Sequence, residues 1–536
     1  MIKAGLISEN KIKTRMIRFA LLALGAILTG LTLVITELGI IEWVSLVPSA
    51  LAIVSVCRDK TVRRRGIYGY GFFFFMCFYL VNYHWFVNLY PLDFVGGITK
   101  PAAVAVVLSG WVGLSVLQSL TGGLVFVLFG ECVRGDTAKR FAPIGALIAG
   151  GLWAIFEWSQ TLGWIGVPWG RLAIGQTHWL LGVQSASLFG SCFVTFLIVT
   201  VNFLIAYAII DQPKRKLFSL LAAAIFLANT LLGAVIYASD TDEEDSINIA
   251  VVQGNISSQE KWSSELEQFN LKVYEEYTAA EAAEQGADIV VWPESALVND
   301  VNVYRAFLGR LARENEVTIL VGAFTADEAQ NDYNSIVAVL PDGSYHDTVY
   351  SKRHLVPFGE YVPMRAVFEV LIPPLTQISM LEEDLMPGEG AQIMYLDGVG
   401  IGAMICFDSI YDELARDSVL SGADVLAIST NDSWFLDSAA LDMHYAQAKL
   451  RAIENNRYVV RAANTGISGF ITPTGESIDM LGVNERGQIT AKVYLKDGNT
   501  LYTIVGNSFV YMCIAVIFLW IIWVKFEKKL DKIIKR

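Results

Sequence analysis

The sequence predicts a multi-pass bundle of membrane-spanning helices joined to an α/β domain, and three observations support this. Apolar residues make up 54% of the 536-residue chain and gather in blocks before residue 239 and after residue 502. The stretch between them, 239–502, is acidic, with 42 Asp and Glu against 16 Lys and Arg. Within it, short β-branched runs alternate with helical stretches that have polar faces. We expect residues 1–238 to form a transmembrane bundle of about seven helices, 239–502 an α/β domain, and 503–536 a final span with a basic tail.

Eight segments are long and apolar enough to cross a bilayer, which takes about 20 residues of helix. They lie at roughly 16–36, 38–57, 67–90, 104–130, 142–163, 184–210, 216–238 and 503–524. The first is too long for a signal peptide and lacks the small-residue cleavage site, so we count it as a span.

The loops between these segments alternate in charge, and lysine and arginine are retained on the cytoplasmic side. The basic regions are the N-terminus, the loops after the second, fourth and sixth segments, and the C-terminal tail. Their residues include Lys3, Lys11, Lys13, Arg15, Arg18, Arg58, Lys60, Arg63, Arg64, Arg65, Arg134, Lys139, Arg140, Lys214, Arg215, Lys216, Lys525, Lys528, Lys529, Lys532, Lys535 and Arg536. The intervening loops hold almost none. Both termini are therefore expected in the cytoplasm and 239–502 on the opposite side.

Two of the expected extracytoplasmic loops, 85–103 and 163–183, are rich in Trp, Tyr, Gly and Pro. Aromatic belts at the membrane–water interface have this composition. The alternative is a rim through which a lipid chain reaches the α/β domain. The net charge of −26 on residues 239–502 argues against a nucleic-acid partner, which would call for a basic face.

Eight short runs in the acidic stretch read as strands of a largely buried sheet. They are Ile247–Val252, Ile289–Trp292, Thr318–Phe324, Ser335–Leu340, Ile401–Cys406, Val425–Thr430, Tyr458–Ala462 and Gly469–Thr472. Helices are expected at Glu265–Glu284 and His444–Asn455, and a solvated linker at 240–245.

Three islands in this stretch carry side chains suited to acyl transfer. Trp292-Pro293-Glu294 places a carboxylate after a strand, and the loop from Ser351 to Pro363 bears Lys352 and Glu360. Cys406, the only cysteine in 239–502, ends a strand and is followed by Asp408. A carboxylate that removes the thiol proton, a cation that lowers the thiol pKa and stabilises the oxyanion, and an attacking thiolate are what transfer through a thioester needs.

These islands resemble the nitrilase superfamily, whose catalytic triad is Glu–Lys–Cys in this chain order. The resemblance implies an αββα sandwich with Glu294 as general base, Lys352 as oxyanion-stabilising lysine and Cys406 as nucleophile. Further matching motifs are Thr430–Phe435, Arg451–Asn455 and Asn464–Ser468. With the surrounding spans, the whole chain resembles the membrane-embedded branch of the superfamily, the apolipoprotein N-acyltransferases, which complete bacterial lipoprotein maturation.

Three residues next to the triad are assigned supporting roles. Glu360 matches a second glutamate beside the family's triad, and it either takes part in the chemistry or only holds Lys352 in place. The family commonly has Cys-Tyr-Glu where this chain has Cys406-Phe407-Asp408. Phe407 keeps the aromatic ring of the family's tyrosine but lacks its hydroxyl, and Asp408 is one methylene shorter than the family's glutamate. A role that depends on that hydroxyl or on the longer carboxylate therefore does not carry over to this chain.

The sequence also offers candidates for a substrate pocket, for a second base and for a metal or cofactor site. Trp434 and Phe435 line the acyl pocket or are core aromatics. His354 invites assignment as a base but is expected to be a structural or rim histidine. The five dispersed histidines have no metal-ligand spacing, and the chain has no phosphate-binding or dinucleotide motif, so neither a metal nor a cofactor is expected.

The leading hypothesis is a monomeric acyltransferase of the bacterial cytoplasmic (inner) membrane. Cys406 would take a fatty acyl chain from a phospholipid and pass it to the α-amino group of a diacylglyceryl-cysteine at a lipoprotein's N-terminus. The competing hypotheses are a membrane-tethered amidase that hydrolyses a small amide, with water as acceptor, and a catalytically inactive scaffold. The preferred acyl chain and headgroup do not follow from the sequence.

Overall fold

A computed structural model describes residues 2–92, 98–134, 142–241, 245–257, 261, 265–371 and 384–534. The chain divides into two compact units. One contains 1–87, 105–237 and 507–536, and the other contains 88–104 and 238–506. Residues 242–244 of the expected acidic linker, and Lys139 and Arg140 of a basic loop, lie outside the described residues.

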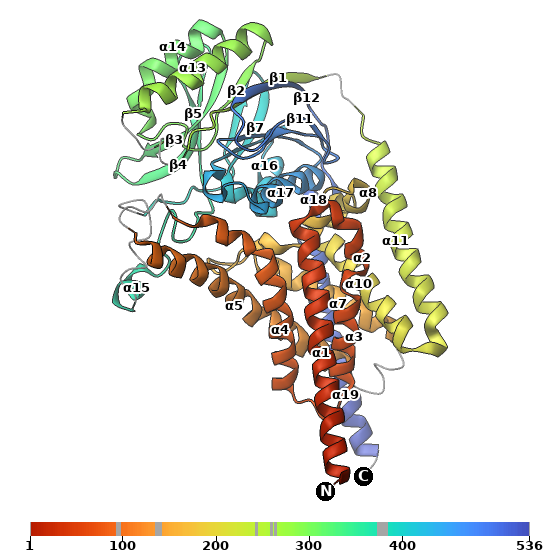
Figure 1. Cartoon of the computed structure of the whole chain (residues 1–536). Helices are drawn as coiled ribbons and strands as arrows, with labels where there is room; N and C mark the ends of the chain where they lie inside the picture. The colour runs from red at the N-terminus through yellow and green to blue at the C-terminus, as the bar shows by residue number, and fades with distance from the viewer. Residues whose placement is uncertain are drawn as a thin grey trace. The chain divides into compact units, whose positions relative to one another are not determined.

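The first unit is helical (Figure 1). Its longer helices are α1 (Ile2–Val34), α3 (Val47–Arg58), α4 (Arg64–Asn82), α5 (Lys100–Val133), α7 (Ala142–Ser159), α10 (Ser191–Ile210), α11 (Arg215–Ala238) and α19 (Ser508–Ile534). Among the described residues, six helical stretches are long and apolar enough to cross a membrane: 11–34, 36–58, 100–133, 191–210, 212–238 and 508–527.

Two of the eight expected spans fall on shorter helices, and a third is interrupted. The expected span 67–90 lies on α4, which has 19 residues and ends at Asn82, where a 3-10 turn follows at His84–Leu89. The expected span 142–163 lies on α7, which has 18 residues. The expected span 184–210 is broken at Gly190, whose φ of +79° ends the short helix α9 (Ala186–Phe189) and precedes α10. Glycine tolerates this left-handed backbone without the steric cost that a Cβ brings.

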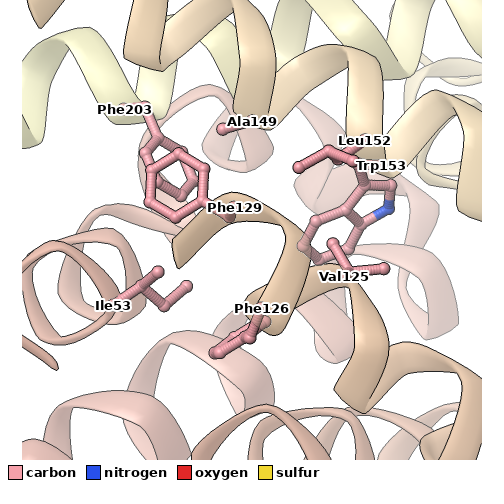
Figure 2. Close-up of a pocket in the computed structure, with 8 residues that line it drawn as sticks. All are labelled: Ile53, Val125, Phe126, Phe129, Ala149, Leu152, Trp153 and Phe203. Atoms are coloured by element: carbon pink, nitrogen blue, oxygen red, sulfur yellow. The ribbon is translucent and has the colours of Figure 1, made fainter. Parts of the chain in front are cut away.

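Helices α7, α10 and α19 pack together through small and aromatic side chains. Ala154, Cys192 and Phe509 belong to one buried cluster. Elsewhere in this unit a small apolar cavity of about 20 Å³ is lined by Ile53, Val125, Phe126, Phe129, Ala149, Leu152, Trp153 and Phe203 (Figure 2). Trp153 is the only one of these side chains with a polar atom, and its indole N–H donates to Glu157 at 3.0 Å, so a water in the cavity would find no free hydrogen-bond partner among them.

The second unit contains two six-stranded mixed sheets. The first has the order β12 (Gly487–Tyr494), β1 (Ser246–Gln253), β2 (Ile289–Val291), β3 (Thr318–Ala326), β4 (Asp332–Val339) and β5 (Tyr345–Ser351). The second has the order β11 (Ser477–Leu481), β10 (Ser468–Ile471), β9 (Tyr458–Ala463), β8 (Val425–Thr430), β7 (Val399–Ile405) and β6 (Ile393–Leu396). All eight expected strands are present.

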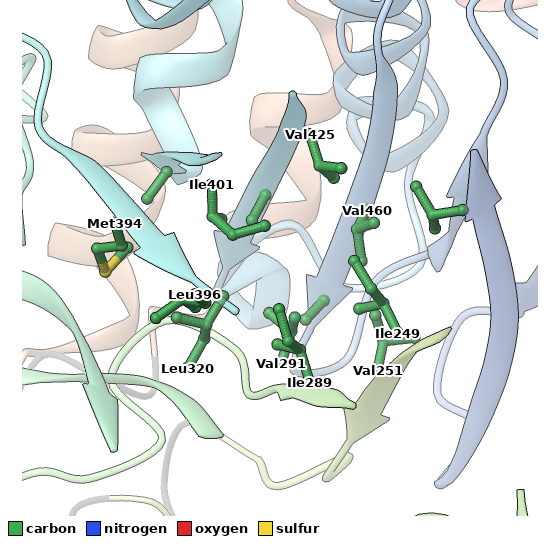
Figure 3. Packing of buried hydrophobic residues seen from close by; sticks show 14 of the residues in the cluster. Ile249, Val251, Ile289, Val291, Leu320, Met394, Leu396, Ile401, Val425 and Val460 are labelled. Carbon is green, nitrogen blue, oxygen red and sulfur yellow. The ribbon is translucent and has the colours of Figure 1, made fainter. Parts of the chain in front are cut away.

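The two sheets pack face to face, and alternate residues of each strand serve different layers. In β1, Ile249 and Val251 join the core between the sheets, whereas Ala250 and Val252 face the helix layer. Figure 3 shows side chains of β1, β2 and β3 meeting those of β6 to β9. Helices α13 (Glu267–Glu284) and α14 (Arg305–Asn315) cover the first sheet, and α16 (Asp412–Leu420) and α17 (Ala439–Asn455) pack on strands of the second (Figure 1). This αββα sandwich is the fold that the sequence predicts.

Candidate active site

The candidate catalytic residues follow the ends of strands from both sheets. Glu294 comes three residues after β2, Lys352 directly after β5, and Cys406 directly after β7. The Nζ atom of Lys352 lies 2.9 Å from Oε1 of Glu294. The Cys406 thiol lies close enough to both residues for their charges to affect its pKa. The fold therefore brings together three residues that are separated by more than 50 positions in the sequence.

Cys406 occupies a strained turn. Its φ is +48°, a left-handed conformation that costs a non-glycine residue about 1–3 kcal/mol. The residue ends β7 and begins a 3-10 turn over Cys406–Ile410. Its carbonyl oxygen accepts hydrogen bonds from Ser409 Oγ at 2.7 Å and from His444 Nε2 at 3.2 Å. These contacts hold the turn in the conformation that presents the thiol.

Lys352 is shared between two buried carboxylates. Its Nζ atom donates to Oε1 of Glu294 and to Oε1 of Glu360, both at 2.9 Å, and the lysine side chain is only 2% exposed. Asn334 donates its amide nitrogen to the same two oxygens, at 2.8 and 2.9 Å. The second oxygen of Glu294 accepts from the backbone N–H of Asn431 at 2.8 Å. Glu360 therefore holds Lys352 through a direct ion pair, which is one of the two roles that the sequence left open for it.

Burial and the shared Lys352 shift the pKa values of Glu294 and Glu360 in opposite directions. Burial alone would raise the pKa of Glu294, but Lys352 and the nearby Lys261 hold it below its ordinary value. Burial raises the pKa of Glu360, and Lys352 offsets this only in part because the charge of Glu294 adds to it. Burial would lower the pKa of Lys352, but the two glutamates keep it well above its usual value. Glu294 is thus the member that stays ionised, as a general base must.

The surroundings of Cys406 favour the protonated thiol over the thiolate. Burial raises the pKa of Cys406 well above that of an ordinary thiol, Glu294 raises it further, and Lys352 offsets only part of the rise. The sequence argument expected the lysine to lower the thiol pKa. It does so as one contribution, which burial and Glu294 outweigh. A thiol in these surroundings would need a base to remove its proton before it could act as a nucleophile.

Asp408 fastens the cysteine turn to the strand and loop that carry Lys352. Its carboxylate accepts from Tyr350 Oη at 2.8 Å, from the His354 backbone N–H at 2.8 Å and from the Ile405 backbone N–H at 3.1 Å. The aspartate is fully buried, and burial raises its pKa. Phe407 meets Tyr411 edge to ring, with centroids 5.4 Å apart. These contacts give both positions a packing role.

The other predicted residues lie beside the site. Trp434 and Phe435 belong to a 3-10 turn (Asp432–Phe435) that follows β8, and both are half-buried. Their place in an acyl pocket remains a prediction. His354 stacks on Tyr411 with centroids 3.9 Å apart, and its Nε2 lies 3.7 Å from Glu413.

Sequence reasoning missed several groups that the fold places here. Asn334 is one. Lys261 is another: its buried Nζ donates to the Glu294 carbonyl oxygen at 2.9 Å, and burial lowers its pKa to about 8. A third is His444 with its partner Asp432. Single polar residues on strands or helices carry no local signal of a shared site. Asp432 did lie in a motif that the sequence singled out.

Within the described residues, ligand atoms of Cys406, Asp432 and His444 lie within 4.8 Å of one another, a set that could hold a metal ion. Arg461 argues against this use. Its Nη2 lies 2.7 Å from Oδ2 of Asp432 and 3.1 Å from Nδ1 of His444. The guanidinium already supplies positive charge at this carboxylate, so we read the set as a hydrogen-bonded network.

Family models match most of the chain. A carbon–nitrogen hydrolase model matches residues 248–501, and a model of the apolipoprotein N-acyltransferase N-terminal domain matches residues 25–204. The apolipoprotein N-acyltransferase of Gloeobacter violaceus is 30% identical and covers 93% of this chain and 92% of its own. That of Geobacter metallireducens is 32% identical and covers 68% of this chain and 71% of its own.

Solved structures of the nitrilase superfamily match about half of the chain. Nit3 of Saccharomyces cerevisiae is 20% identical, with a TM-score of 0.38, and covers 47% of this chain and 93% of its own. An amidase of Nesterenkonia is 19% identical, with a TM-score of 0.39, and covers 51% of this chain and 99% of its own.

Proposed function

The chain belongs to the apolipoprotein N-acyltransferase family, and from this premise we propose its reaction and the residues that carry it. A fatty acyl chain passes from a membrane phospholipid to Cys406 as a thioester. It then passes to the α-amino group of a diacylglyceryl-cysteine at a lipoprotein's N-terminus. The observation that carries the assignment is the buried contact between Glu294 and Lys352 beside Cys406 in its strained turn.

In the first half-reaction, Glu294 takes the thiol proton of Cys406 as the sulfur attacks the ester carbonyl of the phospholipid. The carbonyl oxygen becomes an oxyanion facing the ammonium of Lys352. The tetrahedral intermediate then collapses, the carbon–oxygen bond to the glycerol breaks, and Glu294 returns its proton to the departing oxygen. A lysophospholipid leaves and the thioester remains.

In the second half-reaction, the neutral α-amine of the acceptor attacks the thioester carbonyl. Glu294 takes a proton from the attacking nitrogen, and Lys352 again faces the oxyanion. The carbon–sulfur bond breaks, Glu294 returns the proton to sulfur, and an amide is formed with the thiol regenerated. Each half-reaction leaves Glu294 ionised, which its lowered pKa favours.

Membrane placement follows from the substrates and the charge pattern. Both lipids are anchored in a bilayer, and six helical stretches among the residues that the structure describes are long and apolar enough to cross one. We place the chain in the cytoplasmic membrane with its α/β domain on the extracytoplasmic side, because the basic loops alternate as retained loops do. We further propose residues 1–238, 239–502 and 503–536 as its three parts and a monomer as the working unit.

Hydrolysis of a small amide would use the same three residues with water as acceptor. It is the less supported reading, because relatives that match over most of the chain are named as acyltransferases.

Mass spectrometry of the Cys406 peptide tests the proposal. The detergent-solubilised protein is incubated with phospholipid and no amine, and the peptide is expected to gain one acyl group. Adding a diacylated lipopeptide should remove the label and yield a triacylated lipopeptide. Cys406→Ala is the matched control. An unlabelled Cys406 in protein that still forms the amide would overturn the thioester route, and discharge to free fatty acid with the lipopeptide present would favour hydrolysis.

A further inference from the structure

A buried polar network lies directly behind the nucleophile and has no role in the reaction derived above. It consists of Thr430, Asp432, His444 and Arg461, with Ser409 at its edge. The side chains of His444, Asp432 and Arg461 are 0–1% exposed. We propose that His444, oriented by Asp432 and Arg461, is a positioning residue that holds the backbone of Cys406 in its reactive turn. The inference rests on Cys406 being the nucleophile of the proposed function.

Both ring nitrogens of His444 are engaged. Nε2 lies 3.2 Å from the carbonyl oxygen of Cys406 and 3.0 Å from Oγ of Ser409. Nδ1 lies 3.0 Å from Oδ1 of Asp432 and 3.1 Å from Nη2 of Arg461. A carbonyl oxygen can only accept a hydrogen bond, so Nε2 must carry the hydrogen that it donates to Cys406. With neither nitrogen left for substrate, the ring acts through the cysteine.

Asp432 and Arg461 fix the position of that ring. Burial opposes ionisation of Asp432, but Arg461 and His444 hold its pKa far below the ordinary value, so it is a permanent anion in the fold. Oδ2 of Asp432 accepts from Arg461 at 2.7 Å, and Oδ1 accepts from the Thr430 hydroxyl at 2.8 Å. With the hydrogen on Nε2, the Nδ1 atom of the neutral ring accepts from Arg461 Nη2, which Asp432 holds in place, so the imidazole meets a fixed partner and its Nε2–H points in one direction.

The contact is made on the backbone of Cys406 itself. Cys406 has a φ of +48°, and a held carbonyl fixes the peptide plane next to the Cα atom from which the side chain leaves. Two donors hold this carbonyl, Ser409 Oγ and His444 Nε2. The Thr430 hydroxyl, which donates to Asp432, also lies close enough to the Cys406 thiol to affect its pKa. One network thus holds the carbonyl of the nucleophile and extends to the surroundings of its thiol.

Two substitutions at one position separate donation from packing. His444→Phe keeps an aromatic ring but removes the donor, whereas His444→Gln keeps an N–H close to the position of Nε2. We expect His444→Phe to slow acyl-enzyme formation about 100-fold, the loss typical of a small displacement of a reacting group. His444→Gln should recover most of that rate. The KM for phospholipid should stay near its wild-type value in both, because the network contacts Cys406 and not the substrate.

The assay measures the rate of Cys406 acylation in the full-length protein with phospholipid vesicles, by the peptide mass described above. His346→Phe, a matched change on β5 outside the network, should acylate at the wild-type rate. Ser409→Ala removes the other donor to the same carbonyl with little change in volume, and it should slow acylation severalfold. It keeps the inference testable should His444→Phe fail to fold.

Equal rates for the His444→Phe, His444→Gln and wild-type proteins would overturn the inference. So would equal losses in His444→Phe and His444→Gln, since that would point to packing, and so would a loss that appears in KM alone. Wild-type acylation by Ser409→Ala would show that the carbonyl needs no second donor and would also count against it. The Cys406→Ala variant distinguishes failure of the proposed function from failure of this inference. If Cys406→Ala still forms product, the proposed function is wrong. If Cys406→Ala is inactive while His444→Phe acylates at the wild-type rate, only the inference about His444 is wrong.

Discussion

Replacing Lys352 by methionine should remove activity and also weaken the fold, and the structure allows the two effects to be separated. Methionine keeps most of the side-chain length but has no charge. The lost ammonium faces the oxyanion in both half-reactions of the proposed cycle, and a donor of that kind is worth about 3–4 kcal/mol. Since about 1.4 kcal/mol is a factor of ten, acyl-enzyme formation should slow by about 10²–10³-fold.

The effect on stability comes from the carboxylates that lose their cation. Glu294 and Glu360 are 7% and 12% exposed, and each is 2.9 Å from the lysine nitrogen. Removing one partner of a buried ion pair typically costs about 3–5 kcal/mol. The cost should fall at the low end because the raised pKa of Glu360 lets it take up a proton. Adding Glu360→Gln to Lys352→Met removes one of the two charges and should restore stability without restoring catalysis.

Two measurements on the same solubilised protein check this reasoning, namely the thermal unfolding midpoint and the rate of Cys406 acylation by peptide mass. Lys492→Met, a change at an exposed lysine of β12, is the matched control and should leave both unchanged. Acylation by Lys352→Met within tenfold of wild type would refute the oxyanion role. A double variant that regains activity together with stability would show that Lys352 acts only by holding the site together.

Four further outcomes are expected. Cys406→Ala should abolish transfer with normal expression and membrane insertion, and Cys406→Ser should be inactive or nearly so because an alcohol is far less acidic than a thiol; turnover by product assay checks both. Glu294→Gln should block thioester formation and add little to the loss in Cys406→Ala, since such residues act as a unit; a full burst of acyl-enzyme would show that another group is the base. Because burial and Glu294 raise the thiol pKa, alkylation of Cys406 by iodoacetamide should keep rising with pH above the ordinary thiol value of about 8.5, and a plateau below pH 7 would contradict this. Asp242→Cys should react with an impermeant maleimide in cells with a permeabilised outer envelope, and Lys214→Cys only after lysis; the reverse pattern would place the α/β domain in the cytoplasm.

The central strands could be predicted from the sequence because they are buried on both faces. A strand between two layers is apolar at most positions, and β7 and β8 are buried throughout. The four strands that the sequence reading missed are β5, β6, β11 and β12, all at sheet edges. Most of their residues are partly or fully exposed, and the three central residues of β11 are exposed. Such a pattern looks like a loop until its partner strand is known.

In the helical unit, too, the sequence predicts the apolar segments better than it predicts where each helix ends. Apolar length identifies the six long stretches, but it does not report where a helix breaks. Gly190 interrupts a run of more than 20 residues through its backbone conformation, and hydropathy is insensitive to φ. The expected span at 67–90 likewise continues past Asn82, where the helix ends.

The candidate site was predictable where one residue sits in a distinctive local motif, as Glu294, Lys352 and Cys406 do. Asn334 lies inside β4, and nothing in its neighbourhood distinguishes it from other strand residues. Its amide nevertheless bridges the two glutamates. His444 is twelve positions from Asp432, on a helix whose face is set by its packing against the second sheet. Contacts such as these depend on the tertiary structure, and no local sequence pattern predicts them.

A thiol with a raised pKa suits the proposed cycle, in which the enzyme waits for two lipid substrates in turn. A preformed thiolate would be open to oxidation and to chance electrophiles between turnovers. Here burial and the charge of Glu294 disfavour the thiolate, and in the proposed cycle the same carboxylate removes the proton when an ester carbonyl is in place. The proposed cycle then needs Glu294 to be ionised again, so that it can accept the proton of the attacking amine. The sharing of Lys352 with Glu360 serves this need, because the second carboxylate takes the raised pKa and leaves Glu294 with the lowered one. In the proposed cycle, Glu360 thus takes the raised pKa, and Glu294 stays ionised so that it can act as the base in both half-reactions.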